Sequence, residues 1–138
     1  MNYWLLKSEA EKYSWDDLLR DKCTFWNGIR NYQARNNLKT MKIGDLAFVY
    51  HSVDEKRILG VARVVKTAYP DKDDADWVMT DIEPVKSLKI PVTLEMIKNS
   101  AELKGMALLK QSRLSVSPVR EAEFKRILEL GSITLQLG

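Results

Sequence analysis

The sequence is poor in the residues that build disulfides, metal sites and covalent catalytic centres. It contains one cysteine and one histidine in 138 residues. A single cysteine excludes an internal disulfide, and one cysteine with one histidine cannot supply the several sulfur or nitrogen ligands that a zinc site needs. We therefore expect no cofactor and no metal, and a fold that is stabilised by its hydrophobic core.

Long hydrophobic runs are also missing. Lys7 and Glu9 interrupt the apolar stretch at the N-terminus before it reaches the length of a signal peptide, and no apolar run is long enough to cross a membrane. Hydrophobic residues make up 45% and charged residues 30% of the chain, which is typical of a folded globular protein. These features predict a cytoplasmic protein with no membrane partner, folded as a single domain over residues 1–138 and monomeric.

Positive charge is unevenly distributed along the chain. The net charge of the whole chain is only +3. Residues 20–42 contain six basic residues and one acid, a net charge of +5, whereas aspartates gather in residues 71–81. The segment 20–42 thus holds more than the whole net charge, although the total is too small to argue for a nucleic-acid partner by itself.

Strands and helices are predicted in an irregular order. Strands are expected at residues 2–6, 46–52, 58–69, 77–88 and 114–119, and helices after Ser14, at about 31–38, from Thr93 to about Leu103, and at 121–130. Pro84 is expected to bend or end its strand, Pro118 to stop the last one, and Gly131 to form a left-handed helix cap. Because strands and helices do not alternate, the expected class is α+β, with a small, mixed, strongly curved sheet or barrel and flanking helices.

Enzymatic function has little support in local motifs. The sequence lacks the glycine patterns of phosphate loops and dinucleotide sites and the serine-hydrolase elbow. His51 is the only imidazole, so an enzyme acting on a nucleotide or nucleic acid would use it as general base, with Glu9 or Cys23 beside it. The plainer interpretation makes His51 a hydrogen-bonding group at a strand end and Cys23 a small buried residue.

Residues 24–37, TFWNGIRNYQARNN, combine aromatic, basic and carboxamide side chains. Aromatic rings stack on nucleobases, arginines neutralise phosphates, and Asn and Gln hydrogen-bond to base edges. The alternative is that Phe25, Trp26 and Tyr32 are core aromatics and the arginines are solvated. The interleaved Asn and Gln favour a binding site, because better helix formers would serve a plain surface helix.

Longer motifs resemble those of the EVE domain family. They include YWLLKSE at 3–9, YSWDDL at 13–18, TFWNGIRNYQARNNLKTMKIGD at 24–45, FVYHS at 48–52 and SRLSVSPV at 112–119, so the resemblance covers essentially the whole chain. It implies a PUA-like fold, a small curved mixed barrel with flanking helices, similar in architecture to the YTH domain. It implies no catalytic activity.

The resemblance also implies a function and a site. The function would be recognition, in an aromatic pocket, of a modified base in DNA or RNA, namely methylated or hydroxymethylated cytosine or methylated adenine. Trp26 would stack on the base, Asn27, Ser8 and Ser52 would hydrogen-bond to its edge, and basic residues would hold the flanking phosphates. The implied site residues are Lys7, Ser8, Trp26, Asn27, Arg30, Asn31, Arg35, Tyr50, His51, Ser52, Leu114, Ser115 and Val116.

Overall fold

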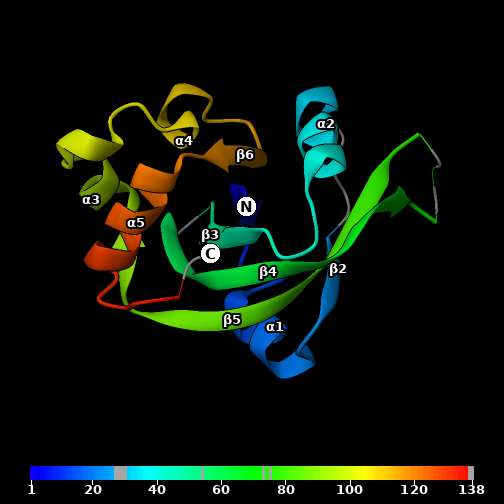
Figure 1. Cartoon of the computed structure of the whole chain (residues 1–138), viewed down its shortest axis with the longest axis horizontal. Helices are drawn as coiled ribbons and strands as arrows, with labels where there is room; N and C mark the ends of the chain where they lie inside the picture. The colour runs from blue at the N-terminus through cyan, green and yellow to red at the C-terminus, as the bar shows by residue number, and fades with distance from the viewer. Residues whose placement is uncertain (27–30, 54, 73, 75, 137–138) are drawn as a thin grey trace.

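A mixed six-stranded sheet organises the chain (Figure 1). The computed structural model describes residues 1–26, 31–53, 55–72, 74 and 76–136. The strands are β1 (Tyr3–Ser8), β2 (Thr24–Trp26), β3 (Leu46–His51), β4 (Arg57–Pro70), β5 (Val78–Thr93) and β6 (Val116–Val119), in the spatial order β2-β5-β4-β3-β1-β6. β1 and β3 are parallel and the other neighbours are antiparallel. The predicted α+β class with a curved mixed sheet is confirmed, and the sheet is open, with β2 and β6 at its edges.

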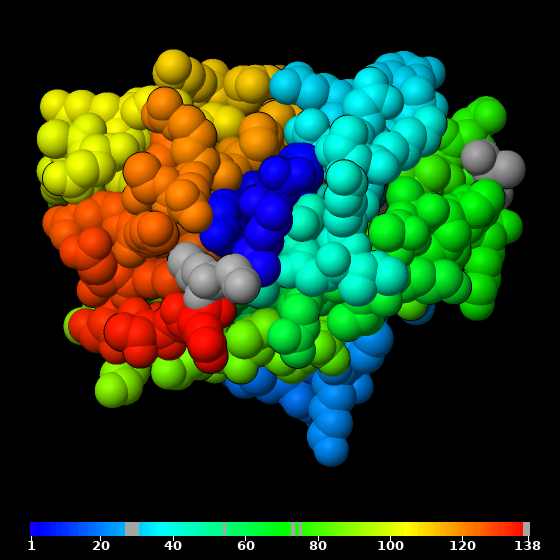
Figure 2. Space-filling view, in the orientation of Figure 1, coloured from blue at the N-terminus to red at the C-terminus, as the bar shows by residue number. Residues whose placement is uncertain are grey.

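Short helices flank this sheet. They are α1 (Trp15–Asp21), α2 (Tyr32–Thr40), α3 (Leu94–Lys98), the 3-10 turn η1 (Ala101–Leu103), α4 (Ala107–Lys110) and α5 (Glu121–Leu130). Figure 1 shows α3, α4 and α5 gathered at one end of the sheet and α2 beside the long β4–β5 hairpin. In Figure 2 the first residues, in dark blue, lie at the surface between the orange C-terminal segments and the cyan region of α2 and β3.

Two hydrophobic clusters pack against opposite faces of the central strands. Along β1, Tyr3 and Leu5 belong to the first cluster, which includes residues of α3, α4 and α5, and Trp4 and Leu6 belong to the second, with residues of α1 and α2. β3 divides in the same way, with all six residues buried. Its near-continuous apolar sequence thus reflects burial on both faces, as predicted.

Hydrogen-bonding side chains set several element ends where the sequence predicts them. Ser14 caps α1 by accepting a bond from the amide of Asp17, and Thr93 caps α3 in the same way from Met96. The predicted continuation of the Thr93 helix is wrong, because α3 ends at Lys98 and a separate 3-10 turn follows.

Two predictions about proline and glycine are wrong, and of the two alternatives for Pro84 the structure excludes one. β5 continues through Pro84, where the pairing with β4 shifts register, so this proline does not end the strand. Pro118 lies within β6, paired with Trp4, because an edge strand tolerates a missing amide proton. Gly131 has φ −80° and is not left-handed; a Cβ atom there would lie 2.8 Å from a methyl carbon of Leu88, so Leu88 would have to shift to accept a side chain.

Candidate functional site

Strand alternation divides the predicted site residues between two faces of the sheet. Lys7 on β1 lies opposite Tyr50 on the parallel strand β3, and Ser8 lies opposite His51. Successive strand residues point to opposite faces, so Lys7 and Tyr50 share one face while Ser8 and His51 share the other. No single cavity can therefore take the side chains of all four residues directly.

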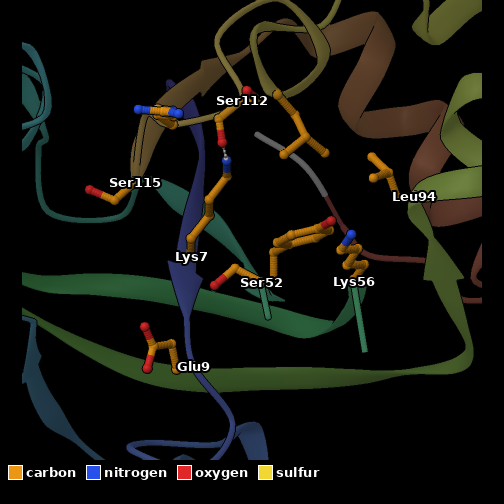
Figure 3. Close-up of a pocket in the computed structure, with 10 residues that line it drawn as sticks. Lys7, Glu9, Ser52, Lys56, Leu94, Ser112 and Ser115 are labelled. Carbon is orange, nitrogen blue, oxygen red and sulfur yellow. Dashed lines mark hydrogen bonds between the residues drawn. The ribbon is translucent and has the colours of Figure 1, made fainter. Parts of the chain in front are cut away.

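A cavity of about 470 Å³ opens on the face of Lys7 and Tyr50 (Figure 3). We call it the cationic cavity, and it is lined by Lys7, Glu9, Tyr50, Ser52, Lys56, Leu94, Leu108, Ser112, Arg113 and Ser115. It brings together four of the predicted residues, namely Lys7, Tyr50, Ser52 and Ser115. Three cations approach it from β1, from the β3–β4 connection and from the turn after α4, against one carboxylate.

Hydrogen bonds fix the walls of the cationic cavity. The Lys7 ammonium donates to the carbonyl of Ser112 at 2.5 Å, and the Lys7 amide donates to the carbonyl of Ser115 at 2.9 Å. The amide of Ser52 donates to the carbonyl of Ser8 at 3.0 Å, which holds the end of β3 against β1. These bonds place hydroxyl and ammonium donors around one space, a donor set suited to phosphate oxygens.

Burial changes the acid–base properties of two residues in this cavity. Loss of hydration lowers the pKa of Lys7, and burial raises the pKa of Tyr50. Tyr50 therefore stays a neutral phenol at pH 7, able to donate and to accept a hydrogen bond.

A neighbouring cavity of about 320 Å³ lies between the start of α2 and the turn after α4. We call it the carboxamide cavity, and its lining residues are Asn31, Gln33, Lys110, Gln111, Ser112, Arg113 and Leu114. Two of the predicted residues, Asn31 and Leu114, lie here. The two cavities share Ser112 and Arg113, so they adjoin each other.

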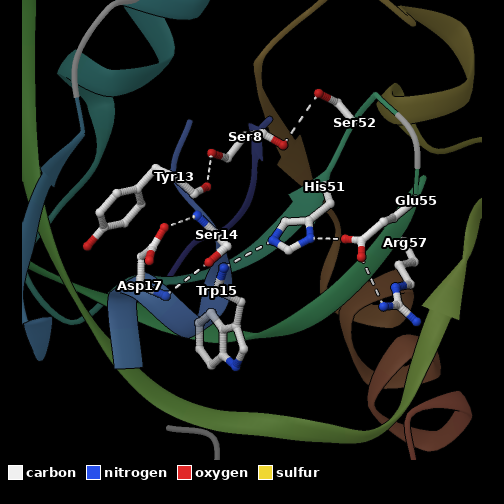
Figure 4. A network of polar contacts seen from close by, with 9 residues as sticks. All are labelled: Ser8, Tyr13, Ser14, Trp15, Asp17, His51, Ser52, Glu55 and Arg57. Carbon is white, nitrogen blue, oxygen red and sulfur yellow. Dashed lines mark hydrogen bonds and ion pairs between the residues drawn. The ribbon is translucent and has the colours of Figure 1, made fainter. Parts of the chain in front are cut away.

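Both ring nitrogens of His51 are engaged inside the protein (Figure 4). Nε2 accepts a hydrogen bond of 3.0 Å from the amide of Trp15, and Nδ1 contacts a carboxylate oxygen of Glu55. The bond to His51 is the main cause that lowers the pKa of Glu55, which also accepts a bond from Arg57. His51 therefore carries a structural hydrogen-bond pair, and neither nitrogen is available as a general base for a substrate.

One of the two residues expected beside His51 is found there. Glu9 lines a cavity with His51, although the carboxylate that contacts the ring is that of Glu55. Cys23 is exposed, so its interpretation as a buried residue is wrong. Ser8, on the same face as His51, uses its hydroxyl to bond the carbonyl of Tyr13 at 2.5 Å.

Trp26 lies in the second hydrophobic cluster rather than on the cationic cavity. It is 7% exposed, and its ring meets Tyr13 edge-on at 6.3 Å between centroids. Val116 is buried in the same cluster. The predicted site residues Asn27 and Arg30 lie outside the described part of the chain.

Two of the predicted site residues at the start of α2, Asn31 and Arg35, have structural partners. Asn31 caps the helix by accepting a bond from the amide of Ala34. The Arg35 guanidinium lies 4.8 Å from the Tyr32 ring centroid and 5.5 Å from that of Trp77, and it donates to the carbonyl of Asp76 at 3.0 Å. The structure therefore does not bring Arg35 to either cavity, because it joins α2 to the β4–β5 connection.

The alternative interpretation, in which Phe25, Trp26 and Tyr32 are all core aromatics, is wrong for two of the three. Phe25 is 52% and Tyr32 is 67% exposed. Only Trp26 is a core aromatic, and β2, which ends with it, is a strand that the sequence pattern did not predict.

Several residues that line the two cavities were not predicted from the sequence. Lys56, Lys110 and Arg113 stand apart from the basic segment 20–42, and Leu94 and Leu108 have the pattern of ordinary core residues. The motif SRLSVSPV contains Ser112 and Arg113, so the resemblance already contained a signal for them. Conversely, Arg20 from the basic segment pairs with Asp17 and Asp21 on α1.

Comparison with known proteins gives one consistent result. The EVE domain model matches residues 2–130. Thymocyte nuclear protein 1 of Mus musculus is 38% identical over an alignment of 165 positions. The alignment covers 94% of this chain and 73% of the mouse protein. The solved structure of human THYN1 protein in complex with DNA containing 5-methylcytosine is 33% identical, with a TM-score of 0.88, and the match covers 98% of this chain and 100% of that chain.

A more distant structure shares the fold alone. The YTH domain of Zygosaccharomyces rouxii MRB1 protein has a TM-score of 0.61 and 11% sequence identity, and the match covers 99% of this chain and 88% of that one. The architectural similarity expected from the sequence is therefore confirmed. Among the described residues, no group of His, Cys, Asp and Glu is arranged to hold a metal ion, and no helix is long and apolar enough to cross a membrane.

Proposed function

This chain belongs to the EVE domain family, and on that premise we propose that it binds a nucleic-acid strand at a modified base without reacting with it. The observation that carries the proposal is the cationic cavity. Lys7, Lys56 and Arg113 come from three separate segments of the chain, yet they line one space with three serines. None of the three forms an ion pair with another described residue, so an anionic ligand would relieve their mutual repulsion.

The human relative in complex with DNA supports a methylated cytosine as the modified base. Human THYN1 protein, whose structure matches almost the whole of this chain, is in complex with DNA that contains 5-methylcytosine. By the resemblance, Trp26 stacks on the extruded base, and Asn27 and Ser52 bond to its edge. The Trp26 ring is buried in the second hydrophobic cluster, so stacking requires it to become accessible when the strand binds, and the Ser8 hydroxyl, already bonded to Tyr13, has a structural role. Lys7, Lys56 and Arg113 then hold the flanking phosphates, with Arg30, while Arg35 positions α2.

The state of His51 supports binding rather than catalysis. An enzyme built on this residue needs a free ring nitrogen, and the bonds to Trp15 and Glu55 use both. The monomeric state and the cytoplasmic location remain predictions, and the animal relatives carry a name that refers to the nucleus.

Trp26→Ala is expected to weaken binding of an oligonucleotide with one 5-methylcytosine by about 1–3 kcal/mol, the value of one stacked base. The same oligonucleotide with cytosine should lose less affinity, because the proposed function has only the modified base stacked on Trp26. Fluorescence anisotropy measures both affinities. Because Trp26 is largely buried, Trp26→Phe, which retains a ring in the core, provides a second variant, and circular dichroism reports the fold of each.

The role of Trp26 is contradicted if folded Trp26→Ala and Trp26→Phe both bind the 5-methylcytosine probe as tightly as the unsubstituted protein. Probes with hydroxymethylcytosine or N6-methyladenine, as single and double strands of DNA and RNA, identify the preferred base. Equal affinity for every probe and its unmodified form would refute modified-base recognition and leave only general nucleic-acid binding.

A further inference from the structure

The carboxamide cavity has the chemistry to read a base. Of its seven lining residues, three carry side-chain carboxamides, namely Asn31, Gln33 and Gln111, and two are cations. No carboxylate lines it. A carboxamide offers a donor and an acceptor side by side, and it pairs with the adjacent donor and acceptor of adenine through two hydrogen bonds.

The three carboxamides are not equally available. The Asn31 side-chain oxygen already accepts the bond from Ala34 that caps α2, which leaves only its NH₂ group. Gln33 and Gln111 are exposed, and neither side chain has a hydrogen bond with another described residue. These two glutamines therefore retain both the donor and the acceptor that base recognition requires.

The wall that carries Gln111 is held in place by backbone bonds. Gln111 donates to the carbonyl of Ala107 at 2.7 Å, and Leu114 donates to the carbonyl of Gln111 at 3.0 Å. In the same turn, the carbonyl of Ser112 accepts the hydrogen bond from the Lys7 ammonium. A fixed wall lowers the entropy lost when a ligand binds, which suits recognition rather than loose attraction.

The position of the cavity indicates which base it would meet. It adjoins the cationic cavity through Ser112 and Arg113, so a strand whose phosphates lie on Arg113 reaches both spaces. Lys110, at the end of α4, forms no ion pair with a described residue and can hold the next phosphate along the strand.

We propose that the carboxamide cavity holds the nucleotide next to the modified one, with Gln33 and Gln111 reading its base and Lys110 holding its phosphate. This inference rests on the proposed function and adds sequence context to it. The ligand is then a strand of at least two nucleotides, and adenine is the neighbour that two glutamines fit best.

The test uses a set of oligonucleotides with one 5-methylcytosine, in which each neighbour of that base is varied in turn over the four bases. We expect the unsubstituted protein to favour adenine on one side by about fivefold or more over a pyrimidine, as a bidentate contact implies. The double variant Gln33→Ala with Gln111→Ala should reduce this preference to less than about twofold. Its ratio of affinities for 5-methylcytosine and cytosine should stay unchanged.

Two further variants serve as comparisons. Gln136→Ala removes an exposed glutamine that lines neither cavity, and it should leave the neighbour preference intact. Lys110→Gln should weaken binding equally for all four neighbouring bases and lower the salt dependence of binding by about one ion.

The outcomes separate this inference from the function on which it rests. If the protein distinguishes 5-methylcytosine from cytosine but shows no neighbour preference, or a preference that survives loss of both glutamines, the inference is wrong and the proposed function stands. A preference that Gln136→Ala also removes would equally refute it. If no probe with a modified base binds better than its unmodified form, the proposed function itself fails.

Discussion

Replacing Lys7, Lys56 and Arg113 together by glutamine is expected to weaken binding of every oligonucleotide by a factor on the order of 10² to 10³ near 0.1 M salt. Each cation that neutralises a phosphate releases about one counterion, and near that salt concentration each release contributes roughly tenfold to the affinity. All three cations line one cavity, so one strand can meet them together. The dependence of log Kd on log salt should also fall by about three ions.

The control for this triple variant removes the same number of positive charges at positions outside the cationic cavity. Lys86, Lys89 and Lys125 are exposed and line neither cavity, so their replacement by glutamine should change affinity little. If both triple variants weaken binding equally, the protein attracts nucleic acid through its overall charge, and the cationic cavity has no special role. An unchanged ratio of modified to unmodified affinity in the first variant would show that the cations do not choose the base.

Gly60→Ala is expected to destabilise the fold by about 3 kcal/mol, the upper part of the range for an overpacked core. A Cβ atom at Gly60 on β4 would lie 2.2 Å from Cζ2 of the Trp15 indole. Trp15 has little room to move, because it is 3% exposed and its indole N–H donates to the hydroxyl of Ser87 at 2.8 Å. Its amide is also bonded to His51, so a shift of the ring strains the start of α1.

Urea unfolding of Gly60→Ala, Trp15→Phe and the double variant measures this clash directly. A phenylalanine lacks the part of the indole that meets Gly60, so the double variant should lose less stability than the two single changes predict by addition. A Gly60→Ala protein within about 0.5 kcal/mol of the parent would show that Trp15 does not lie against β4 as described.

The local patterns of the sequence were sufficient for most of the fold. β3 was readable because its first five residues form one apolar run. α1 and α3 were readable because Ser14 and Thr93, whose hydroxyls can cap a helix, each precede one. β2 was missed because three residues are too few to show alternation. Gly131 was misjudged because its backbone is not left-handed, while its close approach to Leu88 is a tertiary contact that no local pattern records.

The site was harder to predict because it depends on distant pairings. Sequence order makes Lys7 and Ser8 neighbours, but only the register with β3 shows that they serve opposite faces. Lys56 and Arg113 are far from Lys7 in the sequence, and the fold alone brings them to one cavity with Lys7. By contrast, Arg35 belonged to the densest basic segment, yet its guanidinium is occupied by Tyr32, Trp77 and Asp76.

The central claim is that this protein distinguishes a modified base from its unmodified form. The most direct measurement is the ratio of Kd values for two oligonucleotides that differ only in the methyl group of one cytosine, determined at two salt concentrations. Burial of one methyl group contributes about 0.8 kcal/mol, so the methylated strand should bind at least about fourfold more tightly. The ratio should be the same at both salt concentrations, because the two strands carry equal phosphate charge. Equal Kd values for the two strands would contradict the claim.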